Sequence, residues 1–172
     1  GWSFSGSPNA RASCTLNFYD HKLYLFGGRG SQNSFASIDN YIWIYSLNDD
    51  NWEFIEPNIE LPILSNHTAQ IYKHYIIFFG GKCDTTNNEN NNLWLFNLLD
   101  NKWRSIDTDN KPKPMSCHAM TIINKTLFVH IHSISNYYMH TINMDHVIND
   151  NKPKWQRLSI QEFPYKIYFH ML

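Results

Sequence analysis

The sequence predicts an all-β fold made of tandem units of four antiparallel strands, and three observations lead to this prediction. First, Gly-Gly pairs at 27–28 and 80–81 and tryptophans at 52, 103 and 155 recur with a period of about 50 residues. Second, each period holds short runs rich in aromatic and β-branched residues, bounded by Asn, Asp or Gly. Third, no segment keeps a helical periodicity. Repeated four-stranded units are the blades of a β-propeller.

The strands of each unit can be placed in order along the chain. The first strands are expected at 14–19, 67–72 and 118–123, and the second strands at 23–28, 76–81 and 127–132. After a long polar loop, the third strands are expected at 41–47, 92–98 and 137–143. A short Asn/Asp turn then leads to a fourth strand that carries the repeated tryptophan. The Asn-rich run at 85–94 predicts a long, solvated loop, since Asn favours turns.

The repeated residues predict how neighbouring blades pack. A blade narrows toward the propeller axis, and glycine allows both close backbone approach and positive φ where the chain leaves the second strand. Aromatic pairs such as Trp43 and Trp52 would fill the wider space between blades. A histidine follows each tryptophan by fifteen residues, at His67, His118 and His170. Equivalent positions on successive blades lie far apart from one another around the propeller axis. We therefore interpret these three residues as buried, hydrogen-bonding histidines and not as the ligands of one metal ion.

Composition bounds the class of protein. The 172 residues are enough for one domain with a sizeable core. The net charge is -1 and there is no basic stripe, so we expect no nucleic-acid partner. No apolar run is long enough to span a bilayer, so we expect no membrane insertion. The three cysteines at 14, 83 and 117 are far apart and odd in number, which predicts reduced thiols and a cytoplasmic protein.

The sequence resembles the kelch-repeat family. The family pattern is a proline and an arginine, a histidine three residues after the arginine, a strand ending in Gly-Gly, a strand with Tyr or Trp, and then Trp. The first unit matches it with Pro8, Arg11, Gly27, Gly28, Tyr45 and Trp52, and has Cys14 in place of the histidine. The second matches with Pro62, His67, Gly80, Gly81, Trp94 and Trp103, and has Leu64 in place of the arginine. The third matches with Pro114, His118 and Trp155, but Ile131 and His132 replace the glycines.

The resemblance implies part of a larger propeller, since kelch propellers usually have about six blades. We expect one partial kelch domain over residues 1–172. Its predicted parts are an outer strand of a preceding blade at 1–7, blades at 8–57, 58–109 and 110–160, of which the last is degenerate, and the start of a further blade at 161–172.

The resemblance also implies a non-catalytic scaffold or adaptor, without a cofactor, that binds a partner protein or peptide. Binding would use the loops after the second strands, at 29–40, 82–92 and 133–136, and the loops between blades, at 56–65 and 108–116. Loops on a rigid scaffold are where function tends to lie. Arg29 could bind a carboxylate with two hydrogen bonds. The candidate contacts with a partner are Arg11, Arg29, Gln32, Lys82, Asp84 and His132.

Two other functions remain open from the sequence. The propeller could be the targeting or regulatory part of a larger enzyme, such as a kelch-containing serine/threonine phosphatase or a BTB-type ubiquitin-ligase adaptor. A more distant alternative is a copper enzyme similar to galactose oxidase, although no spacing singles out its Tyr, Cys and His ligands. His130 and His132 alternate along a strand, with His140 nearby, but two ligands are too few for a closed metal site. We therefore expect no metal and no catalytic residue.

Overall fold

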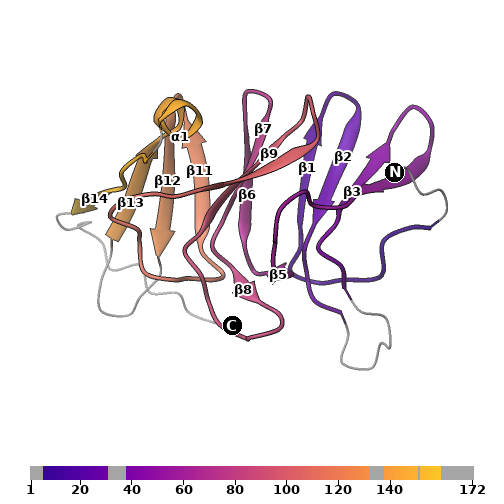
Figure 1. Cartoon of the computed structure of the whole chain (residues 1–172), viewed down its shortest axis with the longest axis horizontal. Helices are drawn as coiled ribbons and strands as arrows, with labels where there is room; N and C mark the ends of the chain where they lie inside the picture. The colour runs from indigo at the N-terminus through magenta and orange to yellow at the C-terminus, as the bar shows by residue number, and fades with distance from the viewer. Residues whose placement is uncertain (1–5, 31–37, 132–137, 151, 160–172) are drawn as a thin grey trace, which may run out of the picture.

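The structure is a computed structural model that describes residues 6–30, 38–131, 138–150 and 152–159. Three four-stranded antiparallel sheets follow one another along the chain, side by side like the leaves of a fan (Figure 1). We call them blade 1, blade 2 and blade 3. They confirm the predicted fold class of propeller blades, and they do not close into a ring within the described residues.

The strands of the three blades have the following bounds. Blade 1 consists of β1 (Thr15–Tyr19), β2 (Lys22–Phe26), β3 (Ile42–Ser46) and β4 (Asn51–Ile55). Blade 2 consists of β6 (Thr68–Tyr72), β7 (Tyr75–Phe79), β9 (Leu93–Asn97) and β10 (Lys102–Ile106). Blade 3 consists of β11 (Ala119–Ile123), β12 (Thr126–Ile131), β13 (Tyr138–Asn143) and β14 (Gln156–Ser159). A separate pair joins β5 (Leu64–Ser65) to β8 (Lys82–Cys83).

The first strands of the blades lie next to one another. β1 contacts β6, and β6 contacts β11, whereas β4, β10 and β14 lie at the outer edge of each sheet. This order places the propeller axis beside β1, β6 and β11. Tight turns join the first two strands of each blade, and the residues after Tyr19, Tyr72 and Ile123 take positive φ where the chain reverses.

Blade 3 differs from the expected unit in two respects. A six-residue helix, α1 (Met144–Asn149), stands where a short turn was predicted. The helix is too short to give a periodic signal, but Asn143 caps its first turn by accepting hydrogen bonds from the N–H groups of Asp145 and His146. The prediction that Trp155 lies on the fourth strand is also wrong, because β14 begins one residue later.

The core is divided into two layers, one on each side of blade 2. Between blades 1 and 2, the ring of Trp103 lies 4.8 Å from that of Phe26. Between blades 2 and 3, the ring of Trp155 lies 5.0 Å from that of Phe79. In each layer a tryptophan from the outer part of one blade packs on the last phenylalanine of the second strand of the preceding blade. Trp52 and Trp43 instead contact Tyr45 and Phe54 within blade 1.

Glycine is required where the second strands end. Gly27 and Gly80 have φ values of 67° and 64°, in the left-handed region that side chains disfavour. A Cβ on Gly27 would lie 2.3 Å from the carbonyl oxygen of Leu64, which belongs to the segment entering blade 2. The chain therefore needs these glycines both for their backbone angle and for the close approach of neighbouring blades. No helix of the described residues is long and apolar enough to cross a membrane.

Candidate functional site

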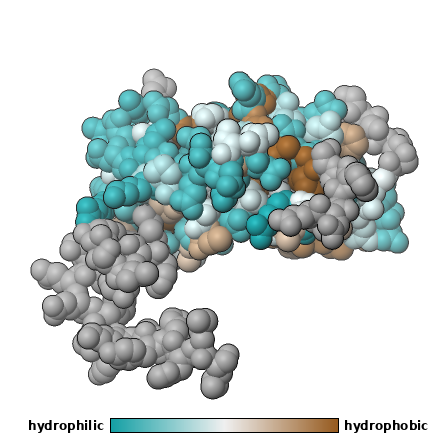
Figure 2. All heavy atoms as spheres, turned by 90° about the horizontal axis from the view of Figure 1, so that it is seen from below, coloured by the Kyte–Doolittle hydropathy of each residue, from teal (hydrophilic) through white to brown (hydrophobic). Residues whose placement is uncertain are grey.

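The candidate site is the face on which the second strands end, which we call the loop face. This side, at the bottom of Figure 1, carries the ends of β2 and β7 with the described residues that follow them, the segments that enter β6 and β11, and the β5–β8 pair. Figure 2 shows the face from below: the described surface is mainly hydrophilic, with a smaller hydrophobic area. The opposite side carries the tight turns and α1.

Backbone hydrogen bonds join the three blades at the loop face. Ser13, Asn66 and Cys117 precede the first strands and have φ values of 59°, 54° and 54°. The N–H of Asn66 donates to the carbonyl of Ser13, and the N–H of Cys117 donates to the carbonyl of Asn66, both at 3.0 Å. Each blade is thus tied to the one before it by the same contact. The repeated contact links the segments that lead into the first strands of the three blades at the loop face.

Arg29 and Lys82 occupy corresponding places on this surface. Arg29 is exposed, and its backbone exchanges two hydrogen bonds of 2.9 Å with Ala12. Lys82 is half-buried on β8, where it pairs with Ser65. Each residue directly follows a Gly-Gly pair and faces the segment that enters the first strand of a blade. The fold therefore repeats a cation on two successive blades.

The other predicted contact residues have different positions. Asp84 is exposed in the loop after β8, and its N–H donates to the carbonyl of Ile63 at 2.9 Å. Gln32 and His132 lie outside the described residues. Of the six candidates, the structure thus brings Arg29, Lys82 and Asp84 to the loop face with surface exposure.

Arg11 is not available to a partner. Its side chain is only 3 % exposed and forms an ion pair of 3.2 Å with Asp39. The guanidinium also donates to the carbonyl of Gly27, and Asp39 accepts a further hydrogen bond from the indole of Trp43. The structure therefore corrects the prediction for Arg11. This arginine connects the segment before β1 with Gly27, at the end of β2, and with Asp39, just before β3.

The Asn-rich loop after β8 is exposed over residues 84–89, in line with the predicted solvated loop, and it is also anchored to the blades. The side-chain amide of Asn90 donates to the carbonyls of Gly80 and Gly81 at 3.1 and 2.9 Å. Its backbone carbonyl accepts from Met115, which belongs to the segment entering blade 3. Ser116 in that segment donates to Glu89 of the loop at 2.5 Å. Sequence reasoning did not single out Asn90 or Glu89, because one asparagine in such a run carries no distinguishing signal.

The repeated histidines connect blades instead of forming a common site. Nε2 of His67 lies 2.9 Å from the hydroxyl of Thr15, and Nε2 of His118 lies 2.7 Å from the hydroxyl of Thr68. Burial lowers the pKa of His67 to about 4 and the pKa of His118 to about 4. Both imidazoles are therefore neutral at pH 7. His170 lies outside the described residues.

The histidines of blade 3 do not converge. His130 pairs with Met139 across β12 and β13, whereas His140 pairs with Val129. Since directly opposite residues share a face and neighbours along a strand do not, His130 and His140 point to opposite faces of the sheet. Among the described residues, no group of three or more His, Cys, Asp or Glu side chains is placed to hold a metal ion.

All three cysteines are free thiols. Cys83 is half-buried at the end of β8, with its sulfur 3.2 Å from the hydroxyl of Thr85. This hydrogen bond lowers the pKa of the Cys83 thiol to about 7. A substantial fraction of Cys83 is therefore the thiolate at neutral pH, within the same loop as Asp84.

Comparison with known proteins gives matches over most of the chain. The model of the KLHDC2/KLHL20/DRC7 Kelch-repeats domain matches residues 2–131. The protein tag-53 of Caenorhabditis elegans is 26 % identical over 137 residues, which are 73 % of this chain and 10 % of that protein. Kelch repeat-containing protein 2 of Saccharomyces cerevisiae is 37 % identical over 71 residues, which are 38 % of this chain and 8 % of that protein. The chain thus spans a tenth or less of the length of these curated relatives.

Proposed function

Because the chain belongs to the kelch-repeat family, we propose that it is a non-catalytic interaction module that binds a partner protein or peptide through the loop face. Kelch-repeat domains are generally protein-interaction propellers. The observation that carries the proposal for this chain is the repeated cation: Arg29 and Lys82 are each held by backbone pairing to the segment that enters the first strand of a blade. Binding to a fixed surface avoids the entropy loss of ordering flexible loops.

The charges on the loop face support a partner with carboxylate groups. An exposed arginine can bind a carboxylate with two parallel hydrogen bonds, and a lysine on the next blade adds a second positive charge. The thiol of Cys83 and the carboxylate of Asp84 lie in the loop that begins at Lys82. These groups would set which acidic segments fit beside the two cations.

We also propose a cytoplasmic location for the protein. The support is chemical: three free thiols, one of them with a lowered pKa, are compatible with a reducing compartment. A thiolate of this kind is prone to oxidation in an oxidising compartment.

A second candidate function is that of a targeting or regulatory propeller within a larger enzyme. It rests on the length of the relatives, since the matched segments are 10 % and 8 % of those proteins. A kelch-containing serine/threonine phosphatase and a BTB-type ubiquitin-ligase adaptor are the two architectures that we consider. In both, the loop face would select the substrate.

The test is to purify the endogenous protein with its bound partners and to identify all peptides by mass spectrometry. The same purification is repeated with a variant that carries Arg29→Glu and Lys82→Glu, and with the control Lys102→Glu on the outer strand β10. We expect a stoichiometric partner with the wild type and the control, and its loss with the double variant. Equal recovery in all three would refute binding through the loop face, and phosphatase or BTB peptides from the same chain would favour the second candidate.

A further inference from the structure

The outward side of blade 1 is an apolar sheet face, which we call open face A. Thr15 of β1 contacts His67 of blade 2, so the alternate residues Leu16 and Phe18 point away from blade 2. They are 57 % and 58 % exposed, and each lies directly opposite a leucine of β2. Blade 1 stands at one end of the fan in Figure 1, and none of the other described blades packs on this face.

The same side of blade 2 is an established interface. Ala69 and Ile71 of β6 correspond to the two exposed residues of β1, and both pack in the core layer between blades 1 and 2. Ile76 and Phe78 of β7 correspond to the two leucines of β2 and are buried in the same layer. Open face A is therefore built like a surface that binds another blade. An exposed apolar surface of this kind marks an interaction site.

The outward side of blade 3, at the other end of the fan, is a second uncovered face, which we call open face B (Figure 1). Met120 and Ile122 of β11 pack in the core layer against blade 2. The alternate residues Ala119, Thr121 and Ile123 therefore point away from blade 2. All three are exposed, Ile123 to 57 %. In blades 1 and 2 the corresponding side packs on the next blade.

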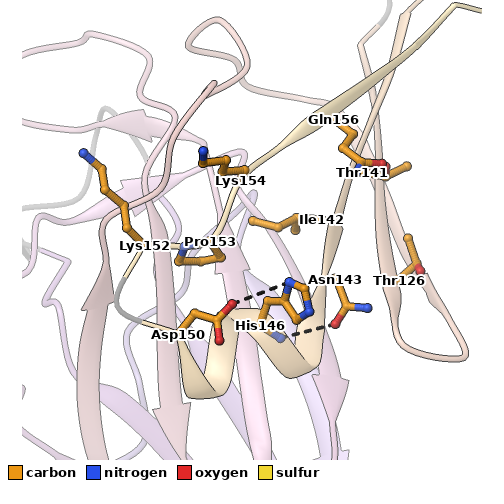
Figure 3. A pocket seen from close by; sticks show the side chains of 10 residues that line it. All are labelled: Thr126, Thr141, Ile142, Asn143, His146, Asp150, Lys152, Pro153, Lys154 and Gln156. Atoms are coloured by element: carbon orange, nitrogen blue, oxygen red, sulfur yellow. Dashed lines mark hydrogen bonds and ion pairs between the residues drawn. The ribbon is translucent and has the colours of Figure 1, made fainter.

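Open face B is hollowed at its outer part. A cavity of about 440 Å³ lies between α1, the end of β13 and the segment that leads into β14, and Thr141 lines it (Figure 3). Thr141 lies opposite Phe128, and Phe128 lies opposite Thr121, which places all three on open face B. Strand register shows that Thr141 stands where blades 1 and 2 have Ile44 and Leu95. The smaller side chain leaves room for larger ones on an opposing surface.

The two open faces differ from the packed faces at matching positions, and the first of these is the junction histidine. At both junctions within the chain, a histidine just before the first strand of one blade contacts a threonine that begins the first strand of the preceding blade. On open face B this threonine is replaced by Ala119, and on open face A this histidine is replaced by Cys14. Both members of the hydrogen-bonded pair are missing together. Packing of the two faces would therefore leave neither a threonine nor a histidine without its partner.

The glycine beside the junction histidine changes in the same way. A Cβ on Gly27 or Gly80 would lie 2.6 or 2.8 Å from Cε1 of that histidine. Open face A has no imidazole there, because Cys14 takes the place of the histidine. The third unit has an isoleucine, at position 131, where the other units have this glycine. The glycine is thus lost from one open face where the ring that requires it is lost from the other.

An aromatic and an aliphatic residue exchange sides between the two faces. In each packed layer, the last residue of one first strand is a tyrosine, and the fourth residue of the next first strand is an isoleucine. These pairs are Tyr19 with Ile71 and Tyr72 with Ile122. On open face B the tyrosine position holds Ile123, and on open face A the isoleucine position holds Phe18. One aromatic and one aliphatic side chain remain, so the combined volume is nearly conserved.

We propose that open face A of one copy of this chain packs on open face B of a second copy. Two such contacts, related by a twofold axis, would bring six blades into one ring, within the four to eight blades of known propellers. The contact would remove the exposed side chains of Phe18 and Ile123 from water, which favours association. The proposal goes beyond the interaction module described above and does not depend on the loop face.

The test is sedimentation equilibrium of the full 172-residue chain over a range of concentrations, which should show a monomer–dimer equilibrium for the wild type. Phe18→Lys and Ile123→Glu each introduce an unpaired charge into both contacts of the dimer. Each should weaken dimerisation at least about a hundredfold. The double variant sets the lysine of one copy against the glutamate of the other in both contacts. It should dimerise at least about tenfold more tightly than either single variant.

The matched control is Leu99→Glu, which changes an apolar residue that is 70 % exposed in the turn between β9 and β10 and should leave the dimer intact. Because Phe18 and Ile123 are exposed within one copy, the circular dichroism spectra of their variants should match that of the wild type. A wild type that is monomeric at every concentration would overturn the proposal, as would a double variant no tighter than the single ones. A dimer that is lost with Phe18→Lys but kept with Ile123→Glu would also overturn it, because such a dimer would join two copies of open face A.

Discussion

The hydroxyl of Thr68 on β6 lies 2.7 Å from Nε2 of His118, a residue that belongs to the next blade. Thr15 makes the same contact with His67 at 2.9 Å. Each contact joins the first strand of one blade to the residue just before the first strand of the next. A buried, neutral imidazole is therefore part of each junction between blades, and this has a consequence for stability.

Acidification should destabilise the protein between pH 6.5 and about 4. His67 and His118 have pKa values of about 4 in the folded protein and 6.5 in an unfolded chain, so the unfolded state binds more protons in this range. The stability that comes from burying the two neutral imidazoles is fully present above pH 6.5. It is lost as the pH falls from 6.5 through about 4, the pKa of these histidines in the folded protein. Each histidine can contribute up to about 1.4 kcal/mol per pH unit. Urea unfolding at pH 7.5, 6.0 and 5.0 measures the slope.

The control for this prediction is His118→Gln, which keeps a hydrogen-bonding side chain beside Thr68 but does not titrate. Its free energy of unfolding should depend on pH less steeply than that of the wild type, because only His67 and His140, whose pKa values are also lowered by burial, remain to contribute. A free energy of unfolding that is constant from pH 7.5 to 5.0 in the wild type would contradict the assignment of both buried histidines.

Replacement of Gly80 by alanine should destabilise the chain. Gly80 has a φ of 64°, and a Cβ there would lie 2.8 Å from Cε1 of His118 and 2.9 Å from the carbonyl oxygen of Met115. We expect a loss of roughly 2 kcal/mol or more, since left-handed strain and a contact with fixed backbone act together. Thermal unfolding of Gly80→Ala is compared with that of Gly6→Ala. Gly6 also has a positive φ, of 146°, but a Cβ there meets no atom within 4 Å, so the comparison tests the close approach rather than the backbone strain. Equal melting temperatures for the two variants would show that close approach at Gly80 is unimportant.

Asn17→Gln should stabilise the junction between blades 1 and 2. The side-chain nitrogen of Asn17 is buried and has no hydrogen-bond partner in the described part of the chain. Gln70, at the corresponding place in blade 2, donates across the next junction to the carbonyl of Met120 at 3.4 Å. One additional methylene would let residue 17 reach the carbonyl of Ala69, which corresponds to Met120, and a gain of about 1 kcal/mol is expected.

The reverse substitution, Gln70→Asn, serves as the matched partner of Asn17→Gln. It should lower the free energy of unfolding in urea by a similar amount, because its amide can no longer span the junction. If Asn17→Gln is destabilising while Gln70→Asn is neutral, the hydrogen bond between first strands is not a source of stability.

Loss of the indole of Trp155 should be among the most damaging changes in blade 3. Trp155 is 2 % exposed, packs on Phe79 and donates from its indole N–H to the hydroxyl of Thr108 at 3.0 Å. Trp155→Ala should cost about 3–5 kcal/mol through the cavity that it leaves. Thr108→Val removes only the hydrogen bond and should cost about 1 kcal/mol. Chemical denaturation measures the free energy of unfolding of both variants. A larger loss for Thr108→Val than for Trp155→Ala would show that the hydrogen bond, and not the packing of the indole, is the main contribution of Trp155.

The repeat made most of the architecture predictable. Strands, turns and Gly-Gly pairs are set by residues that are close together in the sequence, so each has a local sequence signal. Because these signals recur with a period of about 50 residues, the assignment of strands in one unit supported the assignment in the others. Even the degenerate third strand of blade 3 was predicted at 137–143, and β13 is found at Tyr138–Asn143. The position of Arg29 and Lys82 on one face follows from the same repetition.

The sequence by itself determined the all-β class, the three blades and the glycines that follow the second strands of blades 1 and 2, because these are set by local backbone preferences and a regular alternation of side chains. Only the tertiary structure decided the partners of individual polar groups. Arg11 pairs with Asp39, 28 residues away, and so is unavailable to a partner, while Asn90 holds a loop onto the glycines that follow β7. The cavity beside Thr141 likewise arises where α1 parts two strands. Such contacts join residues distant in the chain, and their geometry exists only once the blades have packed.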